Sequence, residues 1–317
     1  MSHKPYRNNF PTVSIIIPTY NRKHKLLRLI KSIMSSDYPL NRIELIIIDD
    51  CSTDGTFDFI RDFLTKYGRV KWMIIRTKRE LFSAKCRNIG IMLAKGKYLL
   101  FADDDNVIHR KMLTSMVSFL EANSSVGIVG PVICYLNNSD TIWCAGMKVY
   151  RILAIARCFA KGKSQITLRR PIKCDAIPSI FMTRCECTST IKFNESLSIV
   201  NDDIDFCLRV KDLGYEVVVI PWAITWHDKP KVKYTFEAFK LKNPKLTYFF
   251  ARNRLLICAT MNKKRIARLL SYCFSYIVNI LRFLLVIFVT RNKMIIHEYF
   301  RGIIDGIRIV LRHELMG

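Results

Sequence analysis

The sequence predicts an α/β protein: a mostly parallel, twisted sheet flanked by helices, followed by a helical C-terminal region. Two observations support this prediction. Through the first 130 residues, apolar runs alternate with amphipathic helical patterns. Continuous Val/Ile/Leu strands in β-α-β-α order are typical of a parallel sheet covered on both faces. From residue 246 onward the chain changes character, and the pattern predicts helices that are both apolar and basic.

The strands of the first half are short apolar runs that end in polar residues. They are expected at VSIIIP (13–18), ELIIID (44–49), VKWMIIR (70–76) and KYLLFAD (97–103). Helices are expected between them, where apolar residues recur every three to four positions, the third over 83–94. Ligands bind outside the carboxyl ends of parallel strands, so polar residues there are candidates for a site.

The charge of the chain is strongly positive and unevenly distributed. The formal net charge is +25, and residues 229–317 hold 18 Lys or Arg against 4 Asp or Glu, a net of +14. Such an excess attracts polyanions in general. A nucleic-acid-binding protein would carry it on a polar face with interleaved aromatic residues. Here it accompanies long apolar helices, so nucleic acid is not expected as a partner. No even cysteine framework and no opening signal segment are evident, which favours reduced, cytoplasmic thiols.

Carboxylates cluster at two of the predicted strand ends. Asp49-Asp50 ends one strand and Asp103-Asp104-Asp105 ends another. Helix capping accounts for one Asp before a helix, but not for a second and third. Like charges this close need a counter-charge, and a divalent cation with oxygen ligands supplies it. The triple cluster therefore predicts Mn²⁺ or Mg²⁺ bound together with substrate phosphates.

A third acidic group opens a predicted helix in NDDIDFCLRVKDLGY (201–215). Negative charge complements a helix N-terminus, but one carboxylate is enough for that. A carboxylate beside a metal-phosphate site could instead act as general base for an incoming hydroxyl. Arg87, on the helix before the triple cluster, could contact a diphosphate or make a surface ion pair. His227 becomes a candidate metal ligand only if the fold returns it to the Asp cluster.

Taken together, seven segments resemble the family 2 glycosyltransferases of GT-A fold. The resemblance covers about residues 12–260 in the right order. The segments are SIIIPTYNR (14–22), IDDCSTDGT (48–56), SAKCRNIGI (83–91), FADDDNV (101–107), FNES (193–196), NDDIDFCLRVKDLGY (201–215) and TWHD (225–228). Each motif alone is weak or moderate, and it is their order that makes the resemblance specific.

The resemblance implies a role for individual residues. Asp203 would be the catalytic base, and Asp105 and His227 would hold Mn²⁺ or Mg²⁺. One base without a nucleophile pair implies inversion at the anomeric carbon. The nucleotide-sugar donor, a UDP-sugar by the commonest family choice, would be bound by Pro18, Thr19, Tyr20, Asp50, Arg87, Asp103 and Asp104.

Three positions depart from the family pattern. Asn201-Asp202 stands where Glu often precedes the base, Ser179 replaces a frequent Gly near the sugar pocket, and Asn194 replaces the usual Asp of FNES. A further element, Tyr248, Arg252 and Asn253 in TYFFARNRLL, resembles a Y-x-x-x-R-N element of members that build surface or lipid-linked glycans. The resemblance leaves open whether that element is structural or binds the acceptor.

The expected domains are a GT-A catalytic domain over 1–245 and a basic, helical, membrane-associated region over 246–317. Within the first, 12–130 is the nucleotide-binding half and 131–245 the acceptor half. Residues 269–289 are long enough to cross a bilayer, yet Ser271, Ser275, Asn279 and Arg282 form a polar stripe along them. Residues 294–312 read as a cleaner amphipathic helix, with Ile296, Tyr299, Phe300, Ile303, Ile304, Ile307, Val310 and Leu311 on its apolar face.

Two helices lying in the cytoplasmic leaflet are favoured for this region. A single span, and a soluble helical pair packed on the domain or on a second copy, stay open. The predicted function is inverting transfer of a sugar to an acceptor hydroxyl on a lipid-linked or surface glycan. The enzyme would sit at the cytoplasmic face of the cell membrane, peripheral or hairpin-anchored. The alternatives are a polyprenyl-phosphate glycosyltransferase and, from another class, a non-catalytic membrane-bound interaction protein.

Overall fold

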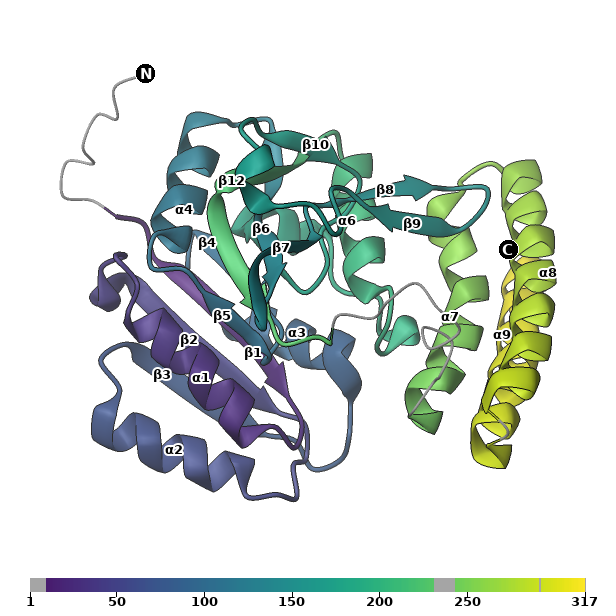
Figure 1. Cartoon of the computed structure of the whole chain (residues 1–317), viewed down its shortest axis with the longest axis horizontal. Coiled ribbons are helices and arrows are strands. Elements are labelled where there is room, and N and C mark those ends of the chain that lie inside the picture. Colours follow the sequence, from purple (N-terminus) through teal and green to yellow (C-terminus); the bar gives the residue numbers. More distant parts are fainter. Residues whose placement is uncertain (1–9, 231–242, 291, 317) are drawn as a thin grey trace.

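The computed structural model describes residues 10–230, 243–290 and 292–316 of the chain. A curved ten-stranded sheet forms its centre, with three long helices at one end (Figure 1). The strand order along the sheet is β10-β12-β6-β11-β4-β1-β2-β3, with β5 paired to β12 and β7 paired to β6. A separate two-stranded ribbon is formed by β8 (Met147–Tyr150) and β9 (Ile155–Cys158).

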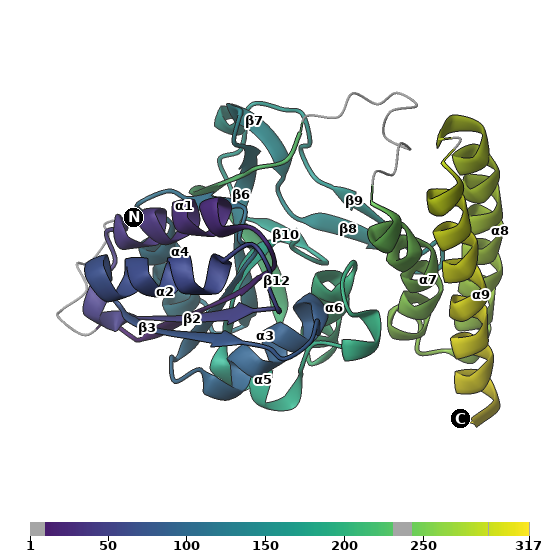
Figure 2. The same ribbon diagram turned by 90° about the horizontal axis from the view of Figure 1, so that it is seen from below.

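The first half of the chain forms the parallel part of the sheet, as predicted. Its strands are β1 (Val13–Thr19), β2 (Ile43–Asp49), β3 (Lys71–Arg76) and β4 (Tyr98–Ala102), and they pair with one another in parallel. The helices between them are α1 (Lys23–Met34), α2 (Thr56–Tyr67) and α3 (Phe82–Leu93). Helices α1 and α2 cover one face and α3 the other (Figure 2). Both faces of β1, β2 and β4 are therefore buried, which explains their apolar sequences, whereas the edge strand β3 is partly exposed.

The second half continues the same sheet with mixed pairings. Strand β11 (Ile180–Arg184) runs antiparallel to both β4 and β6 (Val126–Tyr135), whereas β12 (Glu216–His227) runs parallel to β6. The remaining strands are β5 (Asn106–Ile108), β7 (Asn138–Cys144) and β10 (Ile172–Cys174). Three helices, α4 (Met112–Ala122), α5 (Cys185–Thr190) and α6 (Asp202–Asp212), pack around it, with 3₁₀ turns η1 (Leu40–Arg42), η2 (Gln165–Thr167) and η3 (Glu195–Leu197).

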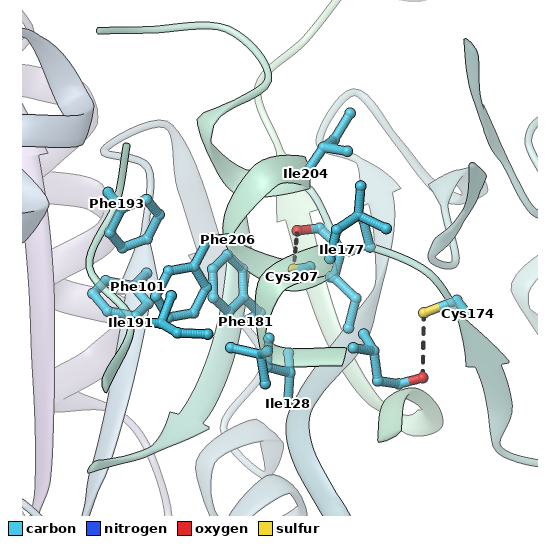
Figure 3. Close-up of a cluster of buried hydrophobic side chains, with 14 of the residues drawn as sticks. Phe101, Ile128, Cys174, Ile177, Phe181, Ile191, Phe193, Ile204, Phe206 and Cys207 are labelled. Carbon is cyan, nitrogen blue, oxygen red and sulfur yellow. Dashed lines mark hydrogen bonds between the residues drawn. The ribbon is translucent and has the colours of Figure 1, made fainter. Parts of the chain in front are cut away.

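An aromatic cluster in the core joins β4 to α6 (Figure 3). The ring of Phe206 stacks on Phe193 with centroids 4.4 Å apart and meets the edge of Phe101 at 5.6 Å. Phe101 lies two residues before Asp103, and Phe206 lies three residues after Asp203. Buried aromatic pairs are rigid, well-packed contacts. This cluster therefore fixes the distance between two of the acidic groups that the sequence singled out.

Helices α7 (Pro244–Met261), α8 (Arg265–Thr290) and α9 (Lys293–Met316) pack side by side at the end of the molecule remote from β3 (Figures 1 and 2). The polar stripe of α8 faces inward: Ser271, Ser275 and Asn279 are fully buried, and Asn279 donates to the carbonyl of Ala251 at 2.9 Å. Arg282, the fourth predicted member of the stripe, is exposed. The opposite, apolar face of α8 is open, and α8 is long and apolar enough to cross a membrane.

The apolar residues predicted for one face of α9 are divided between the interior and the surface. Tyr299 and Ile303 are buried, but Phe300 and Leu311 are more than half exposed. Part of the contact between α9 and α7 involves glycine, which no apolar pattern reveals. A Cβ added at Gly302 would lie 2.4 Å from the carbonyl oxygen of Tyr248 and 3.0 Å from the Cβ of Ala251. Small residues at such positions allow two helix backbones to approach closely.

Substituting Gly302→Leu should therefore destabilise the helical end of the protein. Forcing a side chain into this contact should cost about 1–3 kcal/mol, more than the roughly 1 kcal/mol that a helix gains when glycine is replaced. Thermal unfolding followed by circular dichroism measures the balance. A melting temperature above that of the wild type would contradict the close contact, because helix propensity alone predicts that increase.

Candidate functional site

A cavity of about 410 Å³ opens at the carboxyl ends of β1, β2 and β4, where the parallel sheet predicts a site. Eight of the predicted site residues line it. They are Pro18, Thr19, Tyr20, Asp50, Arg87, Asp103, Asp104 and Asp203. The other two, Asp105 and His227, lie buried beside it and hydrogen-bond each other.

The loop after β4 carries the triple carboxylate, and each Asp has a different environment. Asp104 is buried and accepts hydrogen bonds from Thr19 Oγ1 at 2.7 Å and from Arg22 at 3.0 Å. Burial raises the pKa of Asp104 to about 6, although the charge of Arg22 opposes the shift. Burial also acts on Asp105, but the hydrogen bond and charge of His227 outweigh it and lower the pKa of Asp105.

The fold returns His227 to this loop, as the metal-ligand prediction requires. Strand β5 follows the triple carboxylate and pairs antiparallel with the end of β12, so that Asn106 lies opposite His227. His227 Nε2 is 2.8 Å from Asp105 Oδ1, and the edge of the Trp143 ring packs against the imidazole. Potential ligand atoms of Asp103, Asp105 and His227 all lie within 4.8 Å of one another.

Two carboxylates and an imidazole suit Mn²⁺ or Mg²⁺ with a coordination shell completed by phosphate or water. The residues present therefore fit a divalent ion. Asp103, which the sequence assigned to the donor, belongs geometrically to this cluster as well.

Two cations that the motifs did not predict as site residues lie beside the cluster. Arg22 Nη1 lies 3.0 Å from Asp104 and 3.2 Å from Asp105, and Lys229 Nζ lies 3.6 Å from Asp105. Arg22 is the last residue of the SIIIPTYNR segment, and Lys229 directly follows TWHD. Their places in or next to these motifs are the sequence signal that could have identified them. Their side chains are about two-fifths exposed. Their positive charges offset the negative charge of the carboxylates, and their exposed atoms can contact an anionic ligand.

Arg87 forms a bridge between the second and third acidic groups. Its side chain is buried on α3, with Nη1 2.5 Å from Asp202 and Nη2 2.6 Å from Asp103. Both terminal nitrogens are thus held by carboxylates. Its predicted contact with a diphosphate stays a prediction, and what the structure adds is a charge link between the β4 loop and the start of α6.

Asp203 differs from its neighbour Asp202 in having no ion pair among the described residues. It lines the cavity, and its oxygens accept hydrogen bonds from the backbone amides of Ile204 at 2.8 Å and Ser179 at 3.3 Å. Burial, together with the charge of Asp202, raises the pKa of Asp203 to about 7. A carboxyl group with that pKa in a cavity is suited to accept a proton near neutral pH.

Two of the departures from the family pattern have a backbone explanation. Ser179 has φ +68° and Asn201 has φ +67°, both in the left-handed region where Gly is preferred and Asn is tolerated. Asn194, the third departure, caps η3 through a hydrogen bond from Ser196 N. Ser179 therefore lies at a position whose φ suits the frequent Gly, and Asn194 makes a cap that an Asp could also make.

Asp50 holds a loop rather than standing free. Its two carboxylate oxygens accept hydrogen bonds from the amides of Leu81 at 2.7 Å and Phe82 at 2.8 Å, at the start of α3. It still lines the cavity, so its predicted contact with a nucleotide base stays a prediction.

Comparison with known families decides the classification. The family model "Glycosyl transferase family 2" matches residues 14–188, more than half of the chain. The chain belongs to this family. The matched region contains the β4 carboxylates and Arg87, whereas Asp203 and His227 follow it.

Curated relatives match shorter parts. The poly(ribitol-phosphate) β-N-acetylglucosaminyltransferase TarS of Staphylococcus aureus is 30% identical over 112 residues, which is 35% of this chain and 19% of TarS. The probable glycosyltransferase YdaM of Bacillus subtilis is 25% identical over 223 residues, 70% of this chain and 51% of YdaM. The matches thus span from a fifth to a half of the length of these relatives.

Solved structures agree with the predicted GT-A fold. The mannosyltransferase PcManGT of Pyrobaculum calidifontis, in complex with GDP-Man and Mn²⁺, has a TM-score of 0.58 at 15% identity, covering 98% of this chain and 81% of its own. Residues 1–349 of S. aureus TarS with UDP-GlcNAc give 0.53 at 16% identity, covering 96% and 92%. The fold predicted from the sequence, with its helical C-terminal appendage, is confirmed.

Proposed function

We propose that this protein is an inverting glycosyltransferase, which transfers a sugar from a nucleotide-sugar donor to an acceptor hydroxyl. The observation that carries the proposal is the position of Asp203: a carboxyl group without an ion pair among the described residues, lining the same cavity as Asp103 and Asp104. Membership of family 2 supports sugar transfer. The relatives bound to GDP-Man and UDP-GlcNAc support a nucleotide-sugar donor, and we favour a UDP-sugar.

In the proposed reaction, Asp203 takes the proton of the acceptor hydroxyl as its oxygen bonds to the anomeric carbon. The glycosidic bond to the nucleotide diphosphate breaks on the opposite face, so configuration inverts. Arg22 and Lys229 hold positive charge near the leaving diphosphate. Asp105 and His227, with Asp103, would hold Mn²⁺ or Mg²⁺, which when bound supplies further stabilisation of leaving-group charge. Pro18, Thr19, Tyr20, Asp50 and Arg87 would contact the donor.

This assignment predicts how activity depends on pH. A general base works only when it is deprotonated, and the pKa of Asp203 is raised to about 7. We therefore expect kcat/KM to rise about tenfold per pH unit below pH 7 and to level off above it. The pH profile of donor turnover, at saturating metal, measures this. An acidic limb near pH 4, the ordinary range of Asp, would contradict the role of a buried Asp203.

The C-terminal helices α7, α8 and α9 support a proposal for the acceptor and for the cellular location of the protein. Helix α7 contributes Leu246, Phe249 and Phe250 to the cavity wall and packs against α8, whose open face is apolar. Basic residues near such a face favour contact with anionic lipid headgroups. We propose that 246–317 associates with the cytoplasmic leaflet of the cell membrane, that 1–245 is the catalytic unit with its cavity completed by the first turns of α7, and that the acceptor is a lipid-linked or surface glycan. The names of relatives that glycosylate poly(ribitol-phosphate) support a surface glycan.

The proposal is tested by a binding screen of purified protein against UDP-, GDP- and dTDP-sugars, with and without Mn²⁺. We expect one nucleotide to bind with metal and to lose most of its affinity when the metal is chelated. Equal binding with and without metal, or binding of none of the donors by folded protein, would contradict the proposal.

A further inference from the structure

The segment that leads into α6 has an unusual backbone conformation. Ser198, Val200 and Asn201 have φ values of +60°, +72° and +67°. Asn tolerates the left-handed region, but for a β-branched residue such as Val200 it is a genuine outlier. Backbone strain of this kind persists only where the surroundings impose it, and it is concentrated at functional sites. Asp202 and Asp203 follow immediately.

Helix α7 imposes this conformation through one side chain. The amide nitrogen Nδ2 of Asn253 donates to three carbonyl oxygens of the segment, those of Leu197 at 2.6 Å, Ile199 at 2.7 Å and Val200 at 2.9 Å. Asn253 is fully buried. A side-chain amide has only two N–H groups, so one of them is shared between two acceptors. The donor capacity of this amide is therefore completely used by the strained segment.

Arg252 orients that amide. Its Nε donates to Asn253 Oδ1 at 2.9 Å, which turns the NH₂ group toward the carbonyls, and its Nη2 donates to the carbonyl of Ser196. Together the two side chains donate hydrogen bonds to four backbone carbonyls of residues 196–200. Neither lines the cavity, whereas other α7 residues do, among them Phe249 and Phe250. This geometry favours a role in holding the segment over direct binding of an acceptor.

Residues 197–201, held in this way, are also hydrogen-bonded to α3 and to the first turn of α6, which carries Asp203. The carbonyl of Ser198 accepts a hydrogen bond from Ala84 N on α3 at 2.9 Å, and the carbonyl of Asn201 accepts one from Asp205 N in the first turn of α6. Asp203 lies two residues beyond Asn201, on that same turn. A shift of the segment would therefore displace the Asp203 carboxylate relative to the cavity.

We propose that Asn253 is a positioning residue for the reaction: it holds residues 197–200 in a strained conformation that aims Asp203 into the cavity. The inference rests on the proposed function of Asp203 as base. It also means that the helical end of the chain is linked to the chemistry through α7, because α8 and α9 pack on the same helix (Figure 1).

The test compares Asn253→Ala with Asn279→Ala. Each removes a fully buried amide that donates to a backbone carbonyl, but Asn279 donates to Ala251 within α7 and does not touch the segment. We expect Asn253→Ala to lower kcat about 100-fold, the effect of displacing a catalytic group by about 1 Å, while the dissociation constants for donor and Mn²⁺ stay within twofold. Asn279→Ala should lose thermal stability too, although less because fewer hydrogen bonds are removed, and it should keep its kcat.

Equal kcat in the two variants, or a loss of donor binding in Asn253→Ala, would overturn the proposal. Arg252→Gln leaves the Asn253 amide in place but removes the donor that orients it. It should also lower kcat, but by a smaller factor than Asn253→Ala does. It provides the test if Asn253→Ala does not fold, and an unchanged kcat there would overturn the proposal too. Full activity of Asp203→Asn would instead refute the base itself, so the two failures are distinguishable.

Discussion

Asp203→Asn is expected to lose sugar transfer almost completely while retaining the donor. The substitution keeps the shape of the side chain and leaves one oxygen that can accept a backbone hydrogen bond, but it removes the ability to take a proton. General base catalysis contributes about 10²–10⁴-fold, and we expect kcat to fall by that factor. Donor affinity should change little, because Asp203 forms no ion pair with the described cations around the cavity. Single-turnover transfer and equilibrium donor binding measure the two quantities separately.

A matched control lies at the other end of the same helix. Asp212 pairs with Arg151 and Lys263 on the surface, outside the cavity. Asp212→Asn should therefore keep wild-type transfer. Transfer by Asp203→Asn at the wild-type rate would remove the base from the mechanism, whereas loss of both donor binding and transfer would indicate a role in binding.

Asp105→Asn is expected to abolish metal-dependent donor binding. Asp105 lies 2.8 Å from His227 and pairs with both Arg22 and Lys229, so among the described residues it contacts more charged groups than the other two members of the metal cluster. Losing an outer-shell partner of a metal ligand typically costs about 10–100-fold in metal affinity, so losing a carboxylate ligand should cost about 100-fold or more in affinity for Mn²⁺. Electron paramagnetic resonance of free Mn²⁺ measures this affinity without any turnover.

Glu80→Gln is the control for Asp105→Asn. Glu80 also lines the cavity, but it pairs with Lys245 and lies outside the metal cluster. Its Mn²⁺ affinity should match that of the wild type. If Asp105→Asn bound Mn²⁺ as tightly as Glu80→Gln does, the cluster of Asp103, Asp105 and His227 would not be the metal site.

The parallel half of the fold and its acidic ends could be predicted because they depend on local sequence. Strands β1, β2 and β4 are mainly apolar, and each ends at a polar residue or directly before one, which the sheet brings to one edge. The approach of His227 to Asp105 depends instead on the antiparallel pairing of β12 with β5, residues more than a hundred positions apart. Only the family resemblance could suggest it. Periodicity alone carries no information on such a pairing.

Other features could not be predicted because their cause is tertiary. Arg22 and Lys229 reach Asp105 only after three segments meet. The close contact of α9 with α7 could not be predicted, because it involves glycine rather than large apolar residues. The polar stripe of α8 could be identified in the sequence, but its partner, the backbone of α7, could not. The strained segment before α6 carries no glycine to reveal its positive φ values.

The most direct measurement is the anomeric configuration of the sugar released when water replaces the acceptor. The donor that binds in the screen, for example a UDP-α-linked sugar, is incubated with enzyme and Mn²⁺, and the first product is observed by NMR before mutarotation. The proposed mechanism predicts slow, metal-dependent release of the β-anomer, which Asp203→Asn lacks. Release of the α-anomer first, or the same release from Asp203→Asn, would contradict an inverting transferase with Asp203 as its base.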